Sequence, residues 1–145
     1  CYINNVLRAQ LERLVGNYAY VVIDNEAGME HISRRTTRKL DALVAVADCS
    51  AKAIRAAGRI RKLASDLEIS VDRAGLVVNR VPEGSGAAAE EIAQTGLALL
   101  AQIPESSAVR DNDIGGRPVF GLPGDDPVVR AVRTLADALT STQGR

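Results

Sequence analysis

Four short apolar runs alternate with helical patterns along the chain, and this alternation limits the possible folds more than any other feature. The runs are 19–24 (AYVVID), 42–47 (ALVAVA), 74–79 (AGLVVN) and 97–103 (LALLAQI). Each has the length and the aliphatic character of a strand that is buried on both faces. Strands that alternate with helices indicate a parallel sheet covered by helices on both sides. We therefore expect an α/β domain of three layers, α/β/α.

The helices between these runs are predicted from apolar spacing and from capping residues. Ser50 is a good N-cap for the segment up to about Leu67, Gly96 ends a short helix, and Asp126 with Pro127 opens the last one. A small strand is expected at 118–120. The expected helices are 4–15, 30–40, 51–67, 87–95, 106–114 and 127–140.

Composition narrows the class of protein. The 145 residues have the size of one domain, taken as 1–145, and aromatic residues make up only 3% of them. Lys+Arg and Asp+Glu are balanced at 18 each, which argues against binding to nucleic acid or to an anionic membrane through net charge. No apolar run approaches the ~20 residues of a membrane helix. Two cysteines, Cys1 and Cys49, form no disulfide framework, so the reducing cytoplasm is the expected location.

The residues at the carboxyl ends of the four apolar runs are the next feature of interest. Right-handed crossovers place the carboxyl ends of parallel strands at one edge of the sheet, where ligands of open α/β sheets bind. That edge would gather Asp24, Asp48, Asn79 and Pro104. We therefore expect a ligand site there.

Asp24 and Gly28 suggest phosphate chemistry. A carboxylate at the tip of a buried strand needs a partner, and Mg²⁺ is one such partner. A glycine four residues later lets the backbone come close to a terminal phosphate. The alternative is a capping aspartate and an ordinary turn glycine.

Asn79, Pro104 and Glu105 suggest a place for a purine base. An asparagine amide offers a donor and an acceptor, which suits the edge of a purine. The alternative for Asn79 is an Asx turn before Pro82. Pro104 and Glu105 follow the fourth run, where exposed backbone groups could also reach a base, or where a strand simply ends.

The segments VVIDNEAGMEHISRRTT, LVVNRV, AQIPES and AVRDNDIGGRPVF together resemble the deviant-Walker P-loop ATPases. That group includes the MinD and ParA ATPases and the nitrogenase iron protein. The segment DNEAGMEH is most similar to the CooC-type accessory ATPase of carbon monoxide dehydrogenase, a nickel-insertion protein. The resemblance extends from about residue 1 to residue 140 and implies a P-loop NTPase-like, mostly parallel sheet.

The resemblance also implies roles for individual residues. Asp24 matches the Walker B aspartate that positions Mg²⁺, and Gly28 matches the switch II glycine that senses the γ-phosphate of ATP. Asn79 matches the asparagine that reads adenine, while Pro104 and Glu105 match the segment beside the base.

Cys1 stands where the second cysteine of a Cys-x-Cys pair would fall. In the CooC-type branch that pair is proposed to bind metal between two subunits, so the resemblance implies Ni or Zn at the interface of a homodimer.

The largest departure from that family is the phosphate cradle. The sequence contains neither GKGGxGKT nor any G-x-x-x-x-G-K-[ST]. By the resemblance, the Walker A strand would precede Cys1, and the chain would be the C-terminal portion of a single ATPase domain. Its sheet would then be incomplete, and the chain alone would not hydrolyse ATP. By the same resemblance, the missing strand would lie inside the sheet, beside the strand expected at 19–24. We expect the isolated chain to close this gap, to pair with another chain, or to be unstable.

Three functions remain open from the sequence. The first is an ATP-dependent maturation ATPase that inserts nickel into carbon monoxide dehydrogenase. The second is a MinD- or ParA-type positioning ATPase, although the tail ADALTSTQGR lacks the apolar face of a membrane helix. The third is an interaction domain without catalysis.

A charged segment follows Gly28. His31 is interpreted as a surface or helix-start residue, with catalysis or metal binding as the alternative. Arg34, Arg35, Arg38 and Lys39 are interpreted as a solvated helix face, with a docking patch for an acidic partner as the alternative.

Overall fold

A computed structural model describes residues 16–25, 39–85 and 88–141, together with Val6, Gln10, Arg13 and Leu14. Three strands, four α-helices and a 3₁₀ helix follow one another in the part from residue 39 onward. They are β1 (Lys39–Asp48), α3 (Ala51–Asp66), β2 (Ser70–Val81), α4 (Ala89–Thr95), β3 (Ala98–Pro104), α5 (Ser107–Ile114), η1 (Val119–Gly121) and α6 (Pro127–Thr140).

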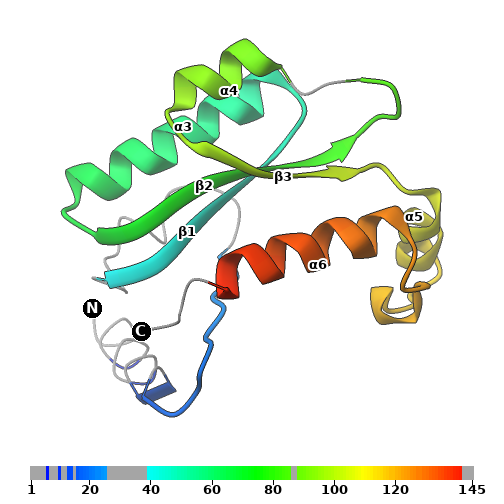
Figure 1. The fold of residues 1–145 in the computed structure, drawn as a ribbon, viewed down its shortest axis with the longest axis horizontal. Helices are drawn as coiled ribbons and strands as arrows, with labels where there is room; N and C mark the ends of the chain where they lie inside the picture. The colour runs from blue at the N-terminus through cyan, green and yellow to red at the C-terminus, as the bar shows by residue number, and fades with distance from the viewer. Residues whose placement is uncertain are drawn as a thin grey trace.

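The three strands form one parallel sheet in the order β1-β2-β3. Helix α3 packs on β1 and β2, α4 packs on α3, and α6 packs on β3. Figure 1 shows α3 and α4 on one face of the sheet and α6 on the other. The predicted three-layer α/β fold with a parallel sheet is therefore confirmed.

The main core lies between the sheet and α3. Ile54 of α3 and Leu76 and Val78 of β2 are completely buried. Val77, on the opposite face of β2, is also buried. No aromatic side chain belongs to the buried core of the described residues, as the composition predicts. The core cluster consists of Ala45, Ala47, Ile54, Ala57, Leu76, Val78, Val81 and Leu97.

Local caps start and stop the helices where the sequence predicts. The Ser50 side chain accepts a hydrogen bond from the backbone N–H of Ala53 at 3.2 Å, which satisfies one free donor at the start of α3. The Asp126 carboxylate accepts from Val128 N at 2.8 Å and so caps α6. Gly96 ends α4 with a φ of 65°, a backbone conformation that suits glycine.

The prediction of a buried strand at 19–24 is wrong. Residues 20–25 form no strand, and Tyr20 and Val22 are 56% and 92% exposed. A strand exists only where another strand bonds to it, and within the described residues β1 pairs with β2 alone. The predicted closing of the gap beside this strand is not seen either, because residues 19–24 join no sheet.

Two other elements differ from the prediction. The expected strand at 118–120 is a 3₁₀ turn, in which Leu122 N donates to Val119 O at 3.1 Å. Lys39 and Leu40, expected at the end of a helix, are the first residues of β1, because they pair with Ser70 and Val71.

Two predicted helices near the N-terminus fall mostly outside the described residues. Residues 30–38 of the expected helix 30–40 are not among them. Of the expected helix 4–15, Val6, Gln10, Arg13 and Leu14 are described, with helical backbone.

Candidate functional site

The carboxyl edge of the sheet brings together four of the residues singled out from the sequence. Asp48, the last residue of β1, lies directly beside Asn79 of β2. Pro104, the last residue of β3, lies beside Val81. The N–H of Glu105 then donates to Val81 O at 2.9 Å and extends the ladder by one bond. The strands therefore hold Asp48, Asn79, Pro104 and Glu105 along one edge, and α5 follows directly.

Asn79 has the most informative environment of the four. Its side chain is partly buried, and its Oδ1 accepts a hydrogen bond from Arg80 N at 2.9 Å. Within the described part of the chain, the amide NH₂ shows no partner. Asn79 can thus donate to a ligand through Nδ2 and accept through the second lone pair of Oδ1.

Asp48 carries a stable negative charge at the start of α3. Its Oδ1 accepts from Ser50 N at 2.8 Å. Hydrogen bonds from the Ser50 side chain and backbone lower the pKa of Asp48 below its usual value, and the positive charge of Arg80 lowers it further. The carboxylate therefore stabilises the start of α3.

Glu105 is occupied by an ion pair. Its carboxylate lies 2.7 Å from Arg110 Nη2, with both side chains about half exposed. Arg117, the other arginine beyond β3, donates from Nε to Asn112 Oδ1 at 3.1 Å. Both arginines thus bind neighbours within the same segment of the chain.

Asp24 does not reach this edge. It is exposed and belongs to a segment that forms no part of the sheet. Figure 1 shows residues 18–25 as an extended trace at the opposite end of the view from α5. The structure therefore does not bring Asp24 next to Asn79. Gly28, Cys1 and His31 lie outside the described residues.

No magnesium site follows from the described side chains. Among them, no group of three His, Cys, Asp or Glu residues could hold a metal ion. The donor set of the edge fits a purine base at Asn79, but it does not by itself fit Mg²⁺, Ni or Zn.

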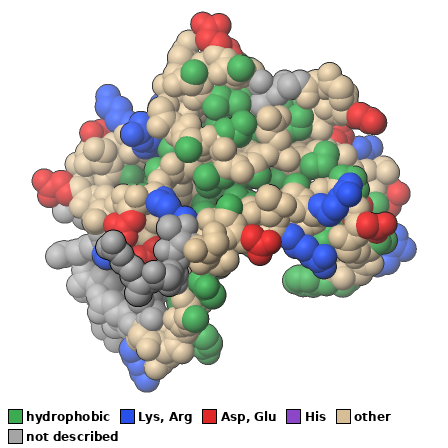
Figure 2. All heavy atoms as spheres, viewed as in Figure 1, with side chains coloured by type: hydrophobic (Ala, Val, Ile, Leu, Met, Phe, Trp, Pro, Cys, Tyr) green, Lys and Arg blue, Asp and Glu red, His purple; other side chains and the backbone are tan. Residues whose placement is uncertain are grey.

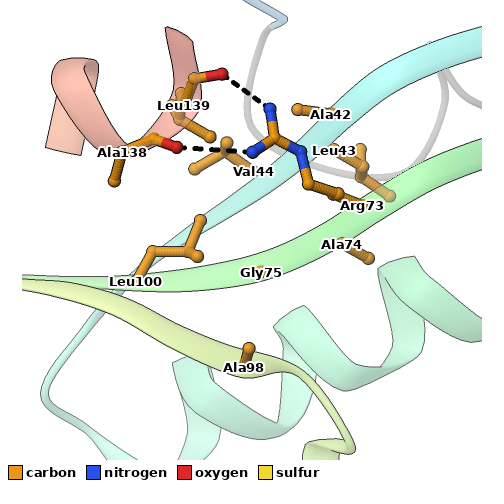
Figure 3. Close-up of a pocket in the computed structure, with 10 residues that line it drawn as sticks. All are labelled: Ala42, Leu43, Val44, Arg73, Ala74, Gly75, Ala98, Leu100, Ala138 and Leu139. Atoms are coloured by element: carbon orange, nitrogen blue, oxygen red, sulfur yellow. Dashed lines mark hydrogen bonds between the residues drawn. The ribbon is translucent and has the colours of Figure 1, made fainter. Parts of the chain in front are cut away.

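A separate cavity of about 250 Å³ lies between the sheet and α6, away from the carboxyl edge. Figure 3 shows Arg73 reaching across it from β2 to the last turn of α6. The Arg73 guanidinium donates to Ala138 O at 3.3 Å and to Leu139 O at 2.6 Å. It therefore satisfies carbonyl groups at the end of the helix. The remaining lining residues are apolar: Ala42, Leu43, Val44, Ala74, Gly75, Ala98, Leu100, Ala138 and Leu139.

Large apolar side chains are exposed at several places on the described residues, among them Val46 of β1, Leu99 of β3 and Val132 of α6. In the view of Figure 2, apolar side chains are visible along the segment before residue 26, beside α5 and across the middle of the molecule. Val22, Ile114 and Phe120 are the most exposed of them, at 92%, 81% and 95%. In the part of the chain that the structure describes, no helix is both long and apolar enough to cross a lipid bilayer.

Sequence reasoning missed two residues of structural interest, Arg73 and Arg80. A lone arginine inside the strand pattern VDRAGLVV was the available signal for Arg73. For Arg80 the only hint was the possible Asx turn at Asn79.

The fold is that of the MinD and ParA P-loop ATPases. MinD of Aquifex aeolicus superposes with a TM-score of 0.74 at 20% identity, over 97% of this chain and 61% of that chain. MinD of Pyrococcus horikoshii, complexed with Mg-ADP, gives 0.75 at 18% identity, over 97% and 58%. A ParA family ATPase of Chlorobium tepidum gives 0.67 at 20% identity, over 94% and 56%.

Sequence comparison points to particular relatives. The uncharacterized ATP-binding protein MJ0685 of Methanocaldococcus jannaschii is 35% identical over 140 residues, which cover 96% of this chain and 55% of the relative. MinD of Thermotoga maritima is 25% identical over 138 residues, covering 91% and 51%. The chain thus spans about half the length of the curated relatives it matches. No protein-family model matches. Together these similarities support a relationship to MinD/ParA-like P-loop ATPases.

Proposed function

We propose that this chain is the adenine-binding part of an ATP-binding, MinD/ParA-like ATPase. The observation that carries the proposal is Asn79, held at the carboxyl edge beside Asp48, with an amide NH₂ that has no partner among the described residues and can donate to a ligand. Adenine presents an N6–H donor next to the N7 acceptor, and an asparagine amide matches both. The relative MJ0685, described as an ATP-binding protein, supports this assignment. Pro104 and Glu105 would then flank the base.

In this proposal the phosphate half of the site comes from polypeptide outside the sequence given. The absence of a P-loop motif and the half-length match to the relatives support this view. A strand added at the edge of β1 that pairs with no described strand would give residues 19–24 a place in the sheet. Asp24 would then face the Mg²⁺ of bound MgATP, and Gly28 would approach the γ-phosphate. The chain alone would not hydrolyse ATP, because its sequence contains no P-loop motif to clamp the phosphates.

The particular role we propose is maturation of a metalloenzyme in the cytoplasm, with nickel delivered to carbon monoxide dehydrogenase by a homodimer. The resemblance of DNEAGMEH to the CooC-type ATPases supports it. Cys1 would supply a thiolate, a ligand type that suits Ni or Zn. A MinD-type positioning role is the second candidate, favoured by the similarity to Thermotoga maritima MinD.

Calorimetric titration with MgATP tests the nucleotide site. The protein is produced with its upstream polypeptide, as wild type, as Asn79→Ala, and as Gln94→Ala on the exposed face of α4. We expect the wild type to bind and Asn79→Ala to weaken binding about tenfold or more, since a bidentate amide contact is worth about 1–3 kcal/mol. Gln94→Ala should bind like the wild type. No binding by the wild type, or equal binding by Asn79→Ala, would refute the nucleotide site.

Metal analysis separates the two roles. The maturation role predicts nickel or zinc at one ion per dimer, lost in Cys1→Ser. A dimer that binds MgATP and contains no such metal would instead favour the positioning role.

A further inference from the structure

Two residues other than glycine have a left-handed backbone in the described part of the chain, Glu68 with a φ of 57° and Arg80 with a φ of 56°. This conformation is unfavourable for residues that carry a Cβ atom. Glu68 has a local explanation, because it follows the end of α3. There Glu68 N donates to Ser65 O and Ile69 N donates to Ala64 O, both at 3.0 Å, as at many helix ends. Arg80 has no helix end beside it and lies within β2.

Arg80 belongs to a β-bulge at the carboxyl edge. Val78 pairs with Gln102, and Val81 pairs with Pro104. Two residues of β2, Asn79 and Arg80, therefore stand opposite a single residue of β3. Bulges of this kind redirect side chains and are frequent beside functional sites. Here the Arg80 side chain is exposed while Val81 returns to the core at 7% exposure.

The bulge also directs the backbone N–H of Arg80 at Asn79 Oδ1, at 2.9 Å. This hydrogen bond fixes the orientation of the Asn79 amide, with Oδ1 toward Arg80 N and the NH₂ group away from it. If the amide turned over, its NH₂ group would face the Arg80 N–H, donor against donor. The position of Oδ1 is thus fixed by the main chain before any ligand arrives.

We propose that Arg80 is a positioning residue whose left-handed backbone makes the site select adenine over 6-oxopurines. The inference rests on the proposed function and extends it to specificity. With Oδ1 held in place, adenine donates its N6–H to Oδ1 and accepts at N7 from Nδ2. A 6-oxopurine has an oxygen where adenine has its N6–H group. That oxygen and Asn79 Oδ1 are both hydrogen-bond acceptors, so they repel each other. The Arg80 guanidinium is not required for this selection.

Competition between ATP and ITP tests the proposal on the protein with its upstream polypeptide. Arg80→Val disfavours the left-handed backbone, because a β-branched residue tolerates it poorly. We expect the preference for ATP over ITP to fall about tenfold in Arg80→Val, the scale of one lost hydrogen bond. Arg80→Ala should lose less of the preference. Arg80→Gly keeps both the N–H and the conformation and should preserve it.

Glu68→Val is the matched control. It introduces the same backbone strain at the amino edge of the sheet, away from Asn79. It should lower the melting temperature and leave the ratio of ATP to ITP affinity unchanged, so that a purely structural effect is separated from positioning. If Arg80→Val does not fold, the ratio for Arg80→Ala, compared with Arg80→Gly, gives the same test.

Each outcome has one meaning. If Arg80→Val and Arg80→Ala both keep the wild-type ratio of ATP to ITP affinity while Asn79→Ala still weakens ATP binding, the proposed function stands and the inference is overturned. An equal loss of selectivity in Glu68→Val also overturns it. A loss in Arg80→Gly would assign the effect to the guanidinium and reject the backbone role. A wild-type protein that does not bind ATP overturns both the inference and the proposed function.

Discussion

Gly75 packs closely against the Leu100 side chain, and replacing it by alanine gives a quantitative test of the fold. It sits in β2, between Val44 of β1 and Ala98 of β3. A Cβ atom at this position would lie 2.4 Å from both Cγ and Cδ1 of Leu100. Ordinary van der Waals contacts begin at about 3.4 Å, so Leu100 must move by about 1 Å.

The expected cost follows from three terms. Overpacking a core costs about 1–3 kcal/mol. Leu100 borders the cavity of about 250 Å³ and can move into it, which favours the lower part of that range. Alanine in a strand interior also recovers about 0.5–1 kcal/mol of the conformational entropy that glycine loses. Gly75→Ala should therefore lower the free energy of unfolding by about 0.5–2 kcal/mol, which corresponds to about 1–8 °C in melting temperature.

Urea unfolding of four proteins checks this reasoning: wild type, Gly75→Ala, Leu100→Ala and the double variant. In the Leu100→Ala background the new methyl group has room, so Gly75→Ala should cost nothing or stabilise. Gly121→Ala is the control, because a Cβ there meets no atom within 4 Å. An equal cost of Gly75→Ala in both backgrounds would refute the predicted clash, and so would a wild-type stability of the single variant.

Three further predictions concern the two ends of the sheet. Ser50→Ala should lower the free energy of unfolding by about 1 kcal/mol, because the Ala53 N–H loses its cap; urea unfolding measures this, and an unchanged midpoint would contradict it. The pKa of Asp48 is lowered in the folded state, so its stabilising contribution is present above about pH 4 and is lost as the pH falls through the folded-state pKa. The urea midpoints of wild type and Asp48→Asn should therefore differ at about pH 7 and approach each other as the pH is lowered below about 4, and a pH-independent difference would argue against this contribution. Arg73→Met should speed hydrogen exchange in the last turn of α6, since Leu139 O loses its donor, and exchange at the wild-type rate would show that the contact does not hold the helix end.

The elements with local signals could be predicted from the sequence. The caps at Ser50 and Asp126 and the glycine at position 96 act on neighbouring residues, so their effect is readable in a single chain. The strand at 19–24 could not be predicted reliably, because pairing is non-local and an apolar segment becomes a strand only beside a partner. The turn at 118–120 was misread for the same reason.

The site was predictable only as far as topology dictates. Parallel strands place Asp48, Asn79 and Pro104 at one edge, and the register confirms that placement. The hydrogen bond that orients the Asn79 amide was not predictable, because the sign of φ at an arginine leaves no trace in the sequence. Asp24 was expected beside Asn79 on the strength of a strand that the structure does not form.

The central claim is that the carboxyl edge of β2 and β3 binds the adenine of ATP, and a structure of the protein with its upstream polypeptide, bound to a non-hydrolysable ATP analogue and Mg²⁺, tests it most directly. The account predicts the adenine edge within hydrogen-bond distance of the Asn79 amide, with the ring beside Pro104 and Glu105. A nucleotide bound elsewhere, such as in the cavity beside Arg73, or an adenine ring that makes no contact with Asn79, would contradict it.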